Sequence, residues 1–526
     1  MAETLNNMQN IDIYNSYTSL PSNMITAELE GIYGSTLTQE MSQIIKLYDI
    51  YEKGADFPID VGKGNYIPSD LKCKKAKKLI DEEARFMFSK PVDFTIKPEG
   101  KLDEQADKKE VKEKISILQS LVDTVLRNNN FNSKVLKAAK DCFIGKRIAL
   151  MLNFNEEGIK LQFAPSLEFV YDTDENDINM LKKLVCFFTV KDDKDKGNQR
   201  IYKKKYWMEN GFCHVHEAIY DGNGTLKETM IEDMTTKFLY IPGTVIINDG
   251  LTGDMLGSSD ILQVADFESK YSKYSNSDLD AERMSMNPIR WARDMNPEST
   301  KDLSIAPGAF WDLSSDVDND MAGEVGQLES NMAYSNALDT TLKRIENNMY
   351  EQLSIPNVNL DTIKGIITSG KGMKAIYWPL IVRCDEKMLE WKRALEFMAD
   401  CIIDGAILYP ESTKYYTVDE IPDIDYSVEV ENNYSLPEDE VEEKTMDIQE
   451  VNAQTMSRRT YMKKWRRLTD DEADIELKQI ALEKQMFEDS YIDENATIEE
   501  EDLDTNKNDV EDISKKPDDT QIKQNL

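Results

Sequence analysis

Residues 257–286 read GSSDILQVADFESKYSKYSNSDLDAERMSM, a stretch that predicts one long helix. Ser258 or Ser259 supplies the N-cap oxygen, and Asp260 puts a negative charge in the first turn, where the helix dipole is positive. A helix of about 28 residues spans roughly 42 Å, so it needs partner helices, because one apolar stripe cannot bury it. That stripe recurs every three or four residues: Ile261, Val264, Phe267, Tyr271 and Tyr274.

Two later stretches predict long helices, and the first of them is the expected partner within the same chain. Pro379 lies inside the second of them and predicts a kink, because proline removes a backbone hydrogen bond and clashes with the previous turn. Residues 331–353 carry apolar side chains at spacings of four and three: Leu338, Leu342, Ile345, Met349 and Leu353. Residues 370–404, which end before Gly405, carry the strongest period in the chain: Ile376, Leu380, Cys384, Met388, Trp391, Leu395, Met398 and Ile402.

The part before residue 257 combines helices with strands. We predict a loose polar arm at residues 1–35, a short helix around residues 41–51, and a helix that ends before Pro91. We interpret the lysines of this second helix, at 74–78, as a solvated face rather than a nucleic-acid patch. Residues 106–140 predict two more helices. Short β-rich runs between residues 145 and 234, separated by turn signals, predict an antiparallel meander of about five to seven strands.

The remaining segments complete an α+β, multidomain class. Prolines, glycines and strand-like pieces at 287–328 predict a small α/β insertion. Residues 355–369 predict a loop. Residues 414–431 are strand-like. Capping boxes at 435–438 and 469–472 start two helices, the second of which carries Ile475, Ile480 and Leu482. From residue 488 the composition predicts a disordered acidic tail.

Length, charge and cysteine usage limit the possible functions. At 526 residues the chain has room for roughly two to four domains. A net charge of −36 excludes a surface that grips nucleic acid everywhere, although a local basic patch could bind it and an acidic surface would let DNA slide past. The six cysteines form no CxxC pair, and neither a secretory signal nor an apolar run of ~20 residues is seen. We expect a soluble protein that works or assembles inside a cell.

Residues 365–372, GIITSGKG, match the phosphate-binding pattern G-x-x-x-x-G-K-[ST] except at the last position. Gly372 lacks the hydroxyl that would bind Mg²⁺, and the preceding segment does not resemble the buried strand that such a loop follows. We favour a flexible glycine loop before a helix. An NTPase that uses Gly365 to Lys371 remains the enzyme alternative, and a cytosolic helical scaffold is the third reading.

We predict neither a catalytic site nor a cofactor nor a structural metal site. The acidic run 316–320 resembles the start of an EF-hand loop, but Met321 and Gln327 stand where the loop needs Gly and Glu. Weak Ca²⁺ binding by these acids remains an alternative. His214 and His216 lie on one strand face, and two ligands are too few for structural zinc.

Residues 457–467, SRRTYMKKWRR, are the best local candidate for nucleic-acid binding. Tyr461 and Trp465 lie four residues apart, so they share a helix face on which a base could stack. Alternatively the two aromatic rings pack the helix while the charges face water. Both readings remain open for the basic residues of this run: Arg458, Arg459, Lys463, Lys464, Arg466 and Arg467.

Five segments follow one another in a recognisable order: DEEARFMFSKPVDFTI, NNNFNSKVLKAAKDCFIGKRIALML, APSLEFVYDTD, VIINDGLTGDMLGSSDILQVADFESKYSKYSNSDLDAE and TSGKGMKAIYWPL. Their order and spacing, over about residues 35–485, resemble the portal proteins of tailed double-stranded DNA bacteriophages, most closely those of long-tailed phages of Gram-positive hosts. Family members often carry Ala where this chain has Gly372, between Ser369-Gly370-Lys371 and Met373-Lys374. Glycine forms helices less readily than alanine.

The resemblance implies a homo-oligomeric ring, usually a dodecamer, at one capsid vertex, where DNA enters during packaging and leaves during ejection. It implies an α+β portal-type fold with these parts: an arm (1–35), a wing (36–256), stem helices (257–286 and 329–354), a clip (287–328), a tunnel loop (355–369), a kinked helix returning to the wing (370–434), a helical crown (435–487) and an acidic tail (488–526). Its location would be the virion, and the host cytoplasm during assembly.

The resemblance also implies partners and contact residues. The partners are further copies of the chain, double-stranded DNA, the terminase large subunit, a head–tail adaptor, and the scaffolding and major capsid proteins. The polar end of helix 257–286, residues 275–278, would face the channel or a neighbouring copy. The tunnel-loop residues toward DNA are Asn357, Asn359, Asp361 and Lys364. The clip residues toward the motor, the adaptor or DNA are Arg290, Trp291, Arg293 and Lys301.

Overall fold

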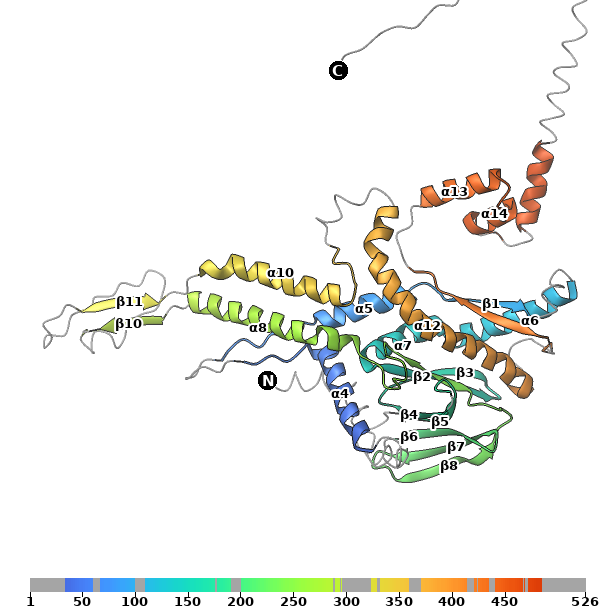
Figure 1. The fold of residues 1–526 in the computed structure, drawn as a ribbon, viewed down its shortest axis with the longest axis horizontal. Coiled ribbons are helices and arrows are strands. Elements are labelled where there is room, and N and C mark those ends of the chain that lie inside the picture. The colour runs from blue at the N-terminus through green and yellow to red at the C-terminus, as the bar shows by residue number, and fades with distance from the viewer. Residues whose placement is uncertain are drawn as a thin grey trace, which may run out of the picture. The chain divides into compact units, whose positions relative to one another are not determined.

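The computed structural model describes residues 34–59, 67–99, 109–175, 177–190, 200–286, 289–293, 295, 323–328, 332–358, 370–413, 421–422, 424–434, 440–466, 468 and 472–484 (Figure 1). The predictions for the arm, the acidic tail and the 316–320 run lie outside these residues. The chain divides into two compact units, Met1–Leu436 and Pro437–Leu526. Helices and strands mix throughout the first unit, which confirms the α+β class. Among the described helices, none has the length and apolar character needed to cross a bilayer.

The helices of the first unit form where the apolar period predicted them. They are α4 (Gly34–Lys53), α5 (Lys75–Phe88), α6 (Lys109–Asn128), α7 (Phe131–Gly145) and α12 (Gly370–Leu408). Pro379 lies inside α12, and the helix bends near its N-terminal end (Figure 1). The predicted apolar stripe of α12 is buried from Leu380 to Ile402. The predicted end before Gly405 is wrong, because the helix continues to Leu408 and packs Gly405 against Phe154.

The strands between residues 147 and 247 form two sheets rather than one meander. One sheet has the order β3-β2-β9, from β2 (Arg147–Asn155), β3 (Gly158–Pro165) and β9 (Gly243–Ile247). The other is a five-stranded antiparallel meander of β4 (Phe169–Thr173), β5 (Leu181–Val190), β6 (Arg200–Glu209), β7 (Phe212–Asp221) and β8 (Leu226–Thr235).

The strand β2 lies between two apolar clusters, and both of its faces are buried. Ile148 and Leu150 face the helical core, whereas Ala149 and Met151 face a second apolar cluster with the five-stranded sheet. A strand covered on both faces belongs at the centre of a sheet, and its sequence is continuously apolar rather than alternating. The prediction of a single meander overlooked this signal in RIALML.

The first unit contains two further strand pairs, each antiparallel. The strand β1 (Asp93–Pro98) pairs antiparallel with β12 (Tyr426–Glu431), which fits the strand-like character predicted for both segments. The strand β10 (Ile289–Arg293) pairs antiparallel with β11 (Glu324–Leu328). Of the predicted small α/β insertion, therefore, the structure describes the strand component.

The opening stretch of sequence forms α8 (Asp260–Met286), and the amide of Ile261 donates to Ser259 Oγ at 3.2 Å, so Ser259 is the N-cap. The short helix η2 (Met332–Tyr334) leads into α10 (Ser335–Gln352), which packs beside α8 (Figure 1). The two helices form the helical hairpin α8–α10, and β10 and β11 extend the chain from the same end of it. Both long helices predicted here are therefore present.

The second unit contains α13 (Glu440–Asn452), α14 (Arg458–Arg466) and a helix over residues 472–484. Both predicted helices are found, and the basic run forms a helix of its own between them. The first capping box and residues 469–471 of the second lie outside the described residues. On the last helix Ile475 and Leu482 are exposed.

Candidate functional site

The buried face of α8 is polar over most of its length. Beyond Val264 the apolar stripe is only partly buried: Phe267 and Tyr271 still pack against the core, and Tyr274 is 44 % exposed. Every fourth residue instead turns inward, and the first three of these side chains are buried: Glu268, Ser272, Asn276 and Asp280. The predicted apolar stripe is therefore wrong for its last member, Tyr274, and polar residues supply the buried face from there on.

These side chains hold an extended segment, residues 69–75, along α8. Four residues of helix advance about 6 Å and two residues of extended chain advance about 6.6 Å, so every fourth side chain meets every second amide. The polar residues near the end of α8 were predicted to face a channel or a neighbouring copy. For Asn276 this is wrong, because its own chain buries it. The bonds run from Ser69 N to Asp280 Oδ1 (3.0 Å), Leu71 N to Asn276 Oδ1 (2.8 Å), Cys73 N to Ser272 Oγ (3.1 Å) and Lys75 N to Glu268 Oε1 (3.2 Å).

The last bond of this series caps α5. Glu268 accepts hydrogen bonds from the first two amides of α5, those of Lys75 and Ala76, and its charge meets the positive end of that helix dipole. Burial nevertheless dominates and raises the pKa of Glu268 to about 7, against the opposing effect of these amides. Glu268 thus ties the helical hairpin to α5 through a carboxyl group that titrates near neutral pH.

We expect Glu268→Gln to change how stability depends on pH. The folded-state pKa of Glu268, about 7, lies above its ordinary value of 4.5, so the folded chain binds more protons in this window. The contribution of Glu268 to the free energy of unfolding therefore falls as pH rises from about 4.5 to 7. Urea titrations at several pH values should show wild type losing stability relative to the variant across this window.

Asp266→Asn, on the exposed side of the same helix, is the matched control for removal of one carboxylate. Burial also raises the pKa values of Asp141 and Asp400 to about 6, but both groups are present in each protein and cancel in the comparison. If the difference in free energy of unfolding between wild type and Glu268→Gln did not vary with pH, the raised pKa of Glu268 would be contradicted.

The first turn of α8 is anchored by a buried ion cluster, which consists of Glu83 on α5, Asp260 on α8, and Arg383 and Lys387 on α12. Both carboxylates are fully buried. Because two anions meet two cations, the cluster is neutral. Its ion pairs are Arg383 Nε–Glu83 Oε1 (2.9 Å), Arg383 Nη2–Asp260 Oδ1 (2.8 Å), Lys387 Nζ–Glu83 Oε1 (2.7 Å) and Lys387 Nζ–Asp260 Oδ2 (2.5 Å).

The pKa values in the cluster reflect competition between burial and charge. Burial opposes ionisation of Glu83, but Lys387 and Arg383 outweigh it and lower the pKa of that carboxyl. Burial, with the nearby Glu83, raises the pKa of Asp260 against the pull of Lys387. The pKa of Lys387 is raised by the two carboxylates despite its burial. The cluster is therefore held together by mutual pairing and fixes the start of α8 to α5 and α12.

The sequence held a signal for this cluster that the apolar pattern obscured. Glu83 occurs on the apolar face of its helix, between Leu79 and Met87. A charged residue in such a position is rarely buried without a partner. Its partners lie about 300 residues further along the chain, and Asp260 was interpreted only as a helix-dipole residue.

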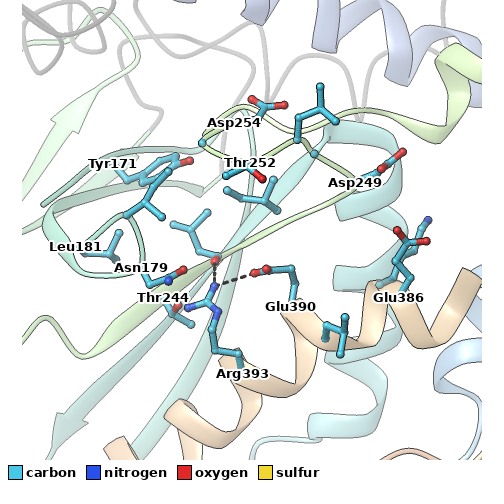
Figure 2. Close-up of a pocket in the computed structure, with 18 of the residues that line it drawn as sticks. Tyr171, Asn179, Leu181, Thr244, Asp249, Thr252, Asp254, Glu386, Glu390 and Arg393 are labelled. Atoms are coloured by element: carbon cyan, nitrogen blue, oxygen red, sulfur yellow. Dashed lines mark hydrogen bonds and ion pairs between the residues drawn. The ribbon is translucent and has the colours of Figure 1, made fainter. Parts of the chain in front are cut away.

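A cavity of about 500 Å³ lies beside the cluster, between α12, the start of β5 and the loop after β9 (Figure 2). Arg393 donates to the carbonyl of Val245 at 3.3 Å and to Glu390 at 3.0 Å, which joins α12 to β9. Further carboxylates, those of Asp249, Asp254 and Glu386, line the cavity (Figure 2). We name it the acidic cavity.

The described part of the chain includes only some of the residues expected to contact DNA or the motor. Asn357 is exposed, and its side-chain amide donates to Asn347 Oδ1 at 2.8 Å. Asn359, Asp361 and Lys364 of the predicted tunnel loop lie outside the described residues, as does Lys301 of the predicted clip.

The three other predicted clip residues lie on β10, where Arg290, Trp291 and Arg293 are exposed. Trp291 is paired with Gly326 on β11, and its indole lies over that glycine, since a Cβ added there would be 2.6 Å from the ring. The structure therefore brings these three residues together on one strand.

The basic run of α14 is largely paired with acids of its own unit. Arg459 pairs with Asp474 at 3.1 Å and Arg466 with Glu476 at 2.7 Å, both on the last helix. Both Lys464 and the indole of Trp465 contact Asp447 of α13, at 2.8 and 2.7 Å. The contacts favour the packing interpretation of Trp465 over base stacking. Arg467 lies outside the described residues.

The histidines lie in the five-stranded sheet, where His216 contacts Asp233 at 3.0 Å and His214 contacts Thr235 at 3.3 Å, both across to β8. The described residues contain no cluster of three or more His, Cys, Asp or Glu that could hold a metal ion. Gly370, Lys371 and Gly372 form the start of α12, while residues 365–369 of the P-loop match lie outside the described part. The NTPase alternative thus gains no support from the described residues.

Comparison with known proteins identifies the family. A search of curated proteins finds no match. The family model described as phage portal protein, SPP1 Gp6-like, matches residues 35–489. This range includes the helical hairpin, the buried ion cluster, the acidic cavity and the three helices of the second unit. The chain therefore belongs to the phage portal protein family, of the SPP1 Gp6-like type.

Proposed function

We propose that this portal protein forms a dodecameric ring in which the helical hairpin α8–α10 surrounds the channel for double-stranded DNA. The family implies an oligomeric ring at the capsid vertex and association with DNA. The observation that carries the finer assignment is the hairpin itself. Two long helices pack side by side, with a strand pair at one end and the buried ion cluster at the other.

We assign the other parts of the portal subunit from the order of the helices and strands along the chain. We assign the stem to residues 257–286 and 329–354, the clip to 287–328, the tunnel loop to 355–369 and the wing to 36–256. The kinked helix and its return to the wing are residues 370–434, and the crown is 435–487. Support comes from α12, which contains Pro379 and supplies Arg383 and Lys387 to the ion cluster that anchors α8. Movement of the tunnel loop at the N-terminal end of α12 would thus be transmitted to the stem.

Charge supports a channel along which DNA slides. The net charge of −36 disfavours tight phosphate binding, which requires Lys and Arg. We propose that the tunnel-loop residues Asn357, Asn359 and Lys364 contact DNA transiently, with Asp361 limiting how tightly it is held. The exposed Arg290, Trp291 and Arg293, with Lys301, would contact the terminase large subunit during packaging and a head–tail adaptor afterwards. The wing would contact the scaffolding and major capsid proteins.

Replacing Asn357, Asn359 and Lys364 together with Ala is expected to leave ring assembly intact and to reduce DNA packaging or retention. The residues lie in a loop that is expected to touch DNA, so their loss should affect translocation rather than folding. Ring mass measured by native mass spectrometry and packaged DNA measured by nuclease protection separate the two effects. Lys46→Ala, exposed on α4, is the control.

Two outcomes of this experiment, and a separate ATPase assay, distinguish the alternatives. A wild-type chain that stays monomeric at all concentrations would overturn the portal assignment itself. Unchanged packaging by intact variant rings would overturn the tunnel-loop assignment alone. Sustained ATP hydrolysis that is abolished by Lys371→Ala would favour the NTPase alternative, whereas the portal family is structural.

A further inference from the structure

Two cavities of opposite charge lie at opposite edges of the three-stranded sheet. The strand order is β3-β2-β9, so β3 and β9 are the outer strands. The acidic cavity includes Thr244 and Val245 of β9. A second cavity, of about 430 Å³, is lined by Lys160 and Leu161 of β3 and by α7. A contact that joins unlike faces of identical subunits is head-to-tail, and such contacts generate rings when the rotation closes.

The acidic cavity carries uncompensated negative charge. Its two deepest cations, Arg383 and Lys387, are already paired with Glu83 and Asp260. Arg393 is paired with Glu390. Asp254 and Glu386 form no ion pair with any described residue, and Glu386 is exposed. The cavity therefore presents a net negative surface.

Two large apolar side chains that line the acidic cavity are exposed to solvent. Leu251, in the loop after β9, is 87 % exposed, and Leu389, one turn after Glu386 on α12, is 70 % exposed. Both line the cavity. Large apolar side chains that are exposed close together, with polar groups around them, mark sites of protein–protein contact.

The second cavity, which we name the lysine cavity, is positive. It is lined by Lys134 and Lys137 of α7 and by Lys160, of which the last two are exposed. Burial lowers the pKa of Lys134, and Lys160 lowers it further. Asp141 also lines this cavity, but its carboxylate accepts a hydrogen bond from the Tyr48 hydroxyl at 3.0 Å. In a chain with a net charge of −36, three lysines in one depression form a local positive surface that complements an acidic one.

The outer edge of β3 is already closed to strand pairing. Asn129 accepts a hydrogen bond from the amide of Leu161 at 2.8 Å and donates to the carbonyl of Ile159 at 2.8 Å, and Lys134 Nζ donates to the carbonyl of Leu161 at 2.5 Å. A partner at this edge must therefore bind through side chains. This restriction favours the exposed ammonium groups of Lys137 and Lys160 as the contacts.

We propose that the lysine cavity of one subunit binds the acidic cavity of the next copy in the ring, with Lys137 and Lys160 facing Asp254 and Glu386. The proposal rests on ring formation and names the surfaces that form the ring. The covering of Leu251 and Leu389 by the neighbour adds apolar burial, and the charges set the register between subunits.

Charge reversal and charge exchange test the proposal in the full-length chain. Lys137→Glu with Lys160→Glu, and separately Asp254→Lys with Glu386→Lys, should each raise the subunit concentration at half-assembly by roughly tenfold or more, because like charges then face each other. The chain that carries all four substitutions should recover assembly, since it restores opposite charges. Mass photometry over a concentration series measures this, and circular dichroism shows whether each variant is folded.

The controls reverse charges outside both cavities. Lys46→Glu on α4 and Glu228→Lys on the edge strand β8 are exposed and should assemble like wild type. Recovery in the four-substitution chain supports the pairing, because a general loss of stability would add rather than cancel. Normal rings from either double reversal, or loss of DNA binding by the lysine variant with intact rings, would overturn it. A wild-type chain that forms no ring would instead overturn the proposed function.

Discussion

Replacing Lys387 with methionine is expected to lower the free energy of unfolding by about 3–5 kcal/mol, because it leaves a buried carboxylate without its cation. Lys387 Nζ lies 2.7 Å from Glu83 and 2.5 Å from Asp260, and Arg383 alone cannot neutralise both. Methionine keeps most of the apolar volume that packs near the Phe143 ring, 3.8 Å from Nζ, so the loss reports charge rather than packing. Urea unfolding at one fixed protein concentration measures it, since assembly adds to apparent stability.

The second carboxylate provides the internal control for this prediction. The double variant Glu83→Gln with Lys387→Met again balances one anion against one cation and should recover a large part of the loss. Lys392→Met, at a half-exposed position of the same helix, should change stability by less than about 0.5 kcal/mol. If Lys387→Met matched Lys392→Met, the ion cluster would not anchor α8 to α12.

Replacing Gly405 with alanine is expected to destabilise the chain by about 1–3 kcal/mol, although alanine favours helices by about 1 kcal/mol over glycine. A Cβ at residue 405 would lie within 2.7 Å of three atoms of the Phe154 ring. The ring cannot withdraw easily, because its centroid lies 5.1 Å from that of Phe238 and 6.1 Å from that of Tyr409. Thermal or urea unfolding gives the sign directly.

A smaller side chain at residue 154 should reduce the cost of Gly405→Ala. In a Phe154→Leu background, Gly405→Ala should cost much less than in wild type, because leucine leaves room for the added methyl group. Equal costs in both backgrounds would show that the loss has another origin. A stabilising Gly405→Ala would mean that helix propensity outweighs contact at this crossing of α12 and β2.

The sequence determined the elements whose side chains repeat with a regular period. The helices α10 and α12, and the first half of α8, follow apolar spacings of three and four, and the order of five segments identified the family over the range that the family model matches. Pro379 predicted the kink, because its effect on the backbone is local. The α+β class followed from the change of period between residues 140 and 147. Such features depend on neighbours within a few residues.

The tertiary structure decided what the polar residues do. Periodicity marks a face as apolar or polar but does not distinguish a polar face in water from one that pairs with distant backbone. Asn276 was therefore misread and Glu268 was not singled out, because their partners, Leu71 and Lys75, lie about 200 residues away. The same holds for Glu83, whose cations are some 300 residues distant, and for the division of the strands into two sheets. A buried charge or amide becomes stable only where folding brings its partner, and only the folded chain shows which partner that is.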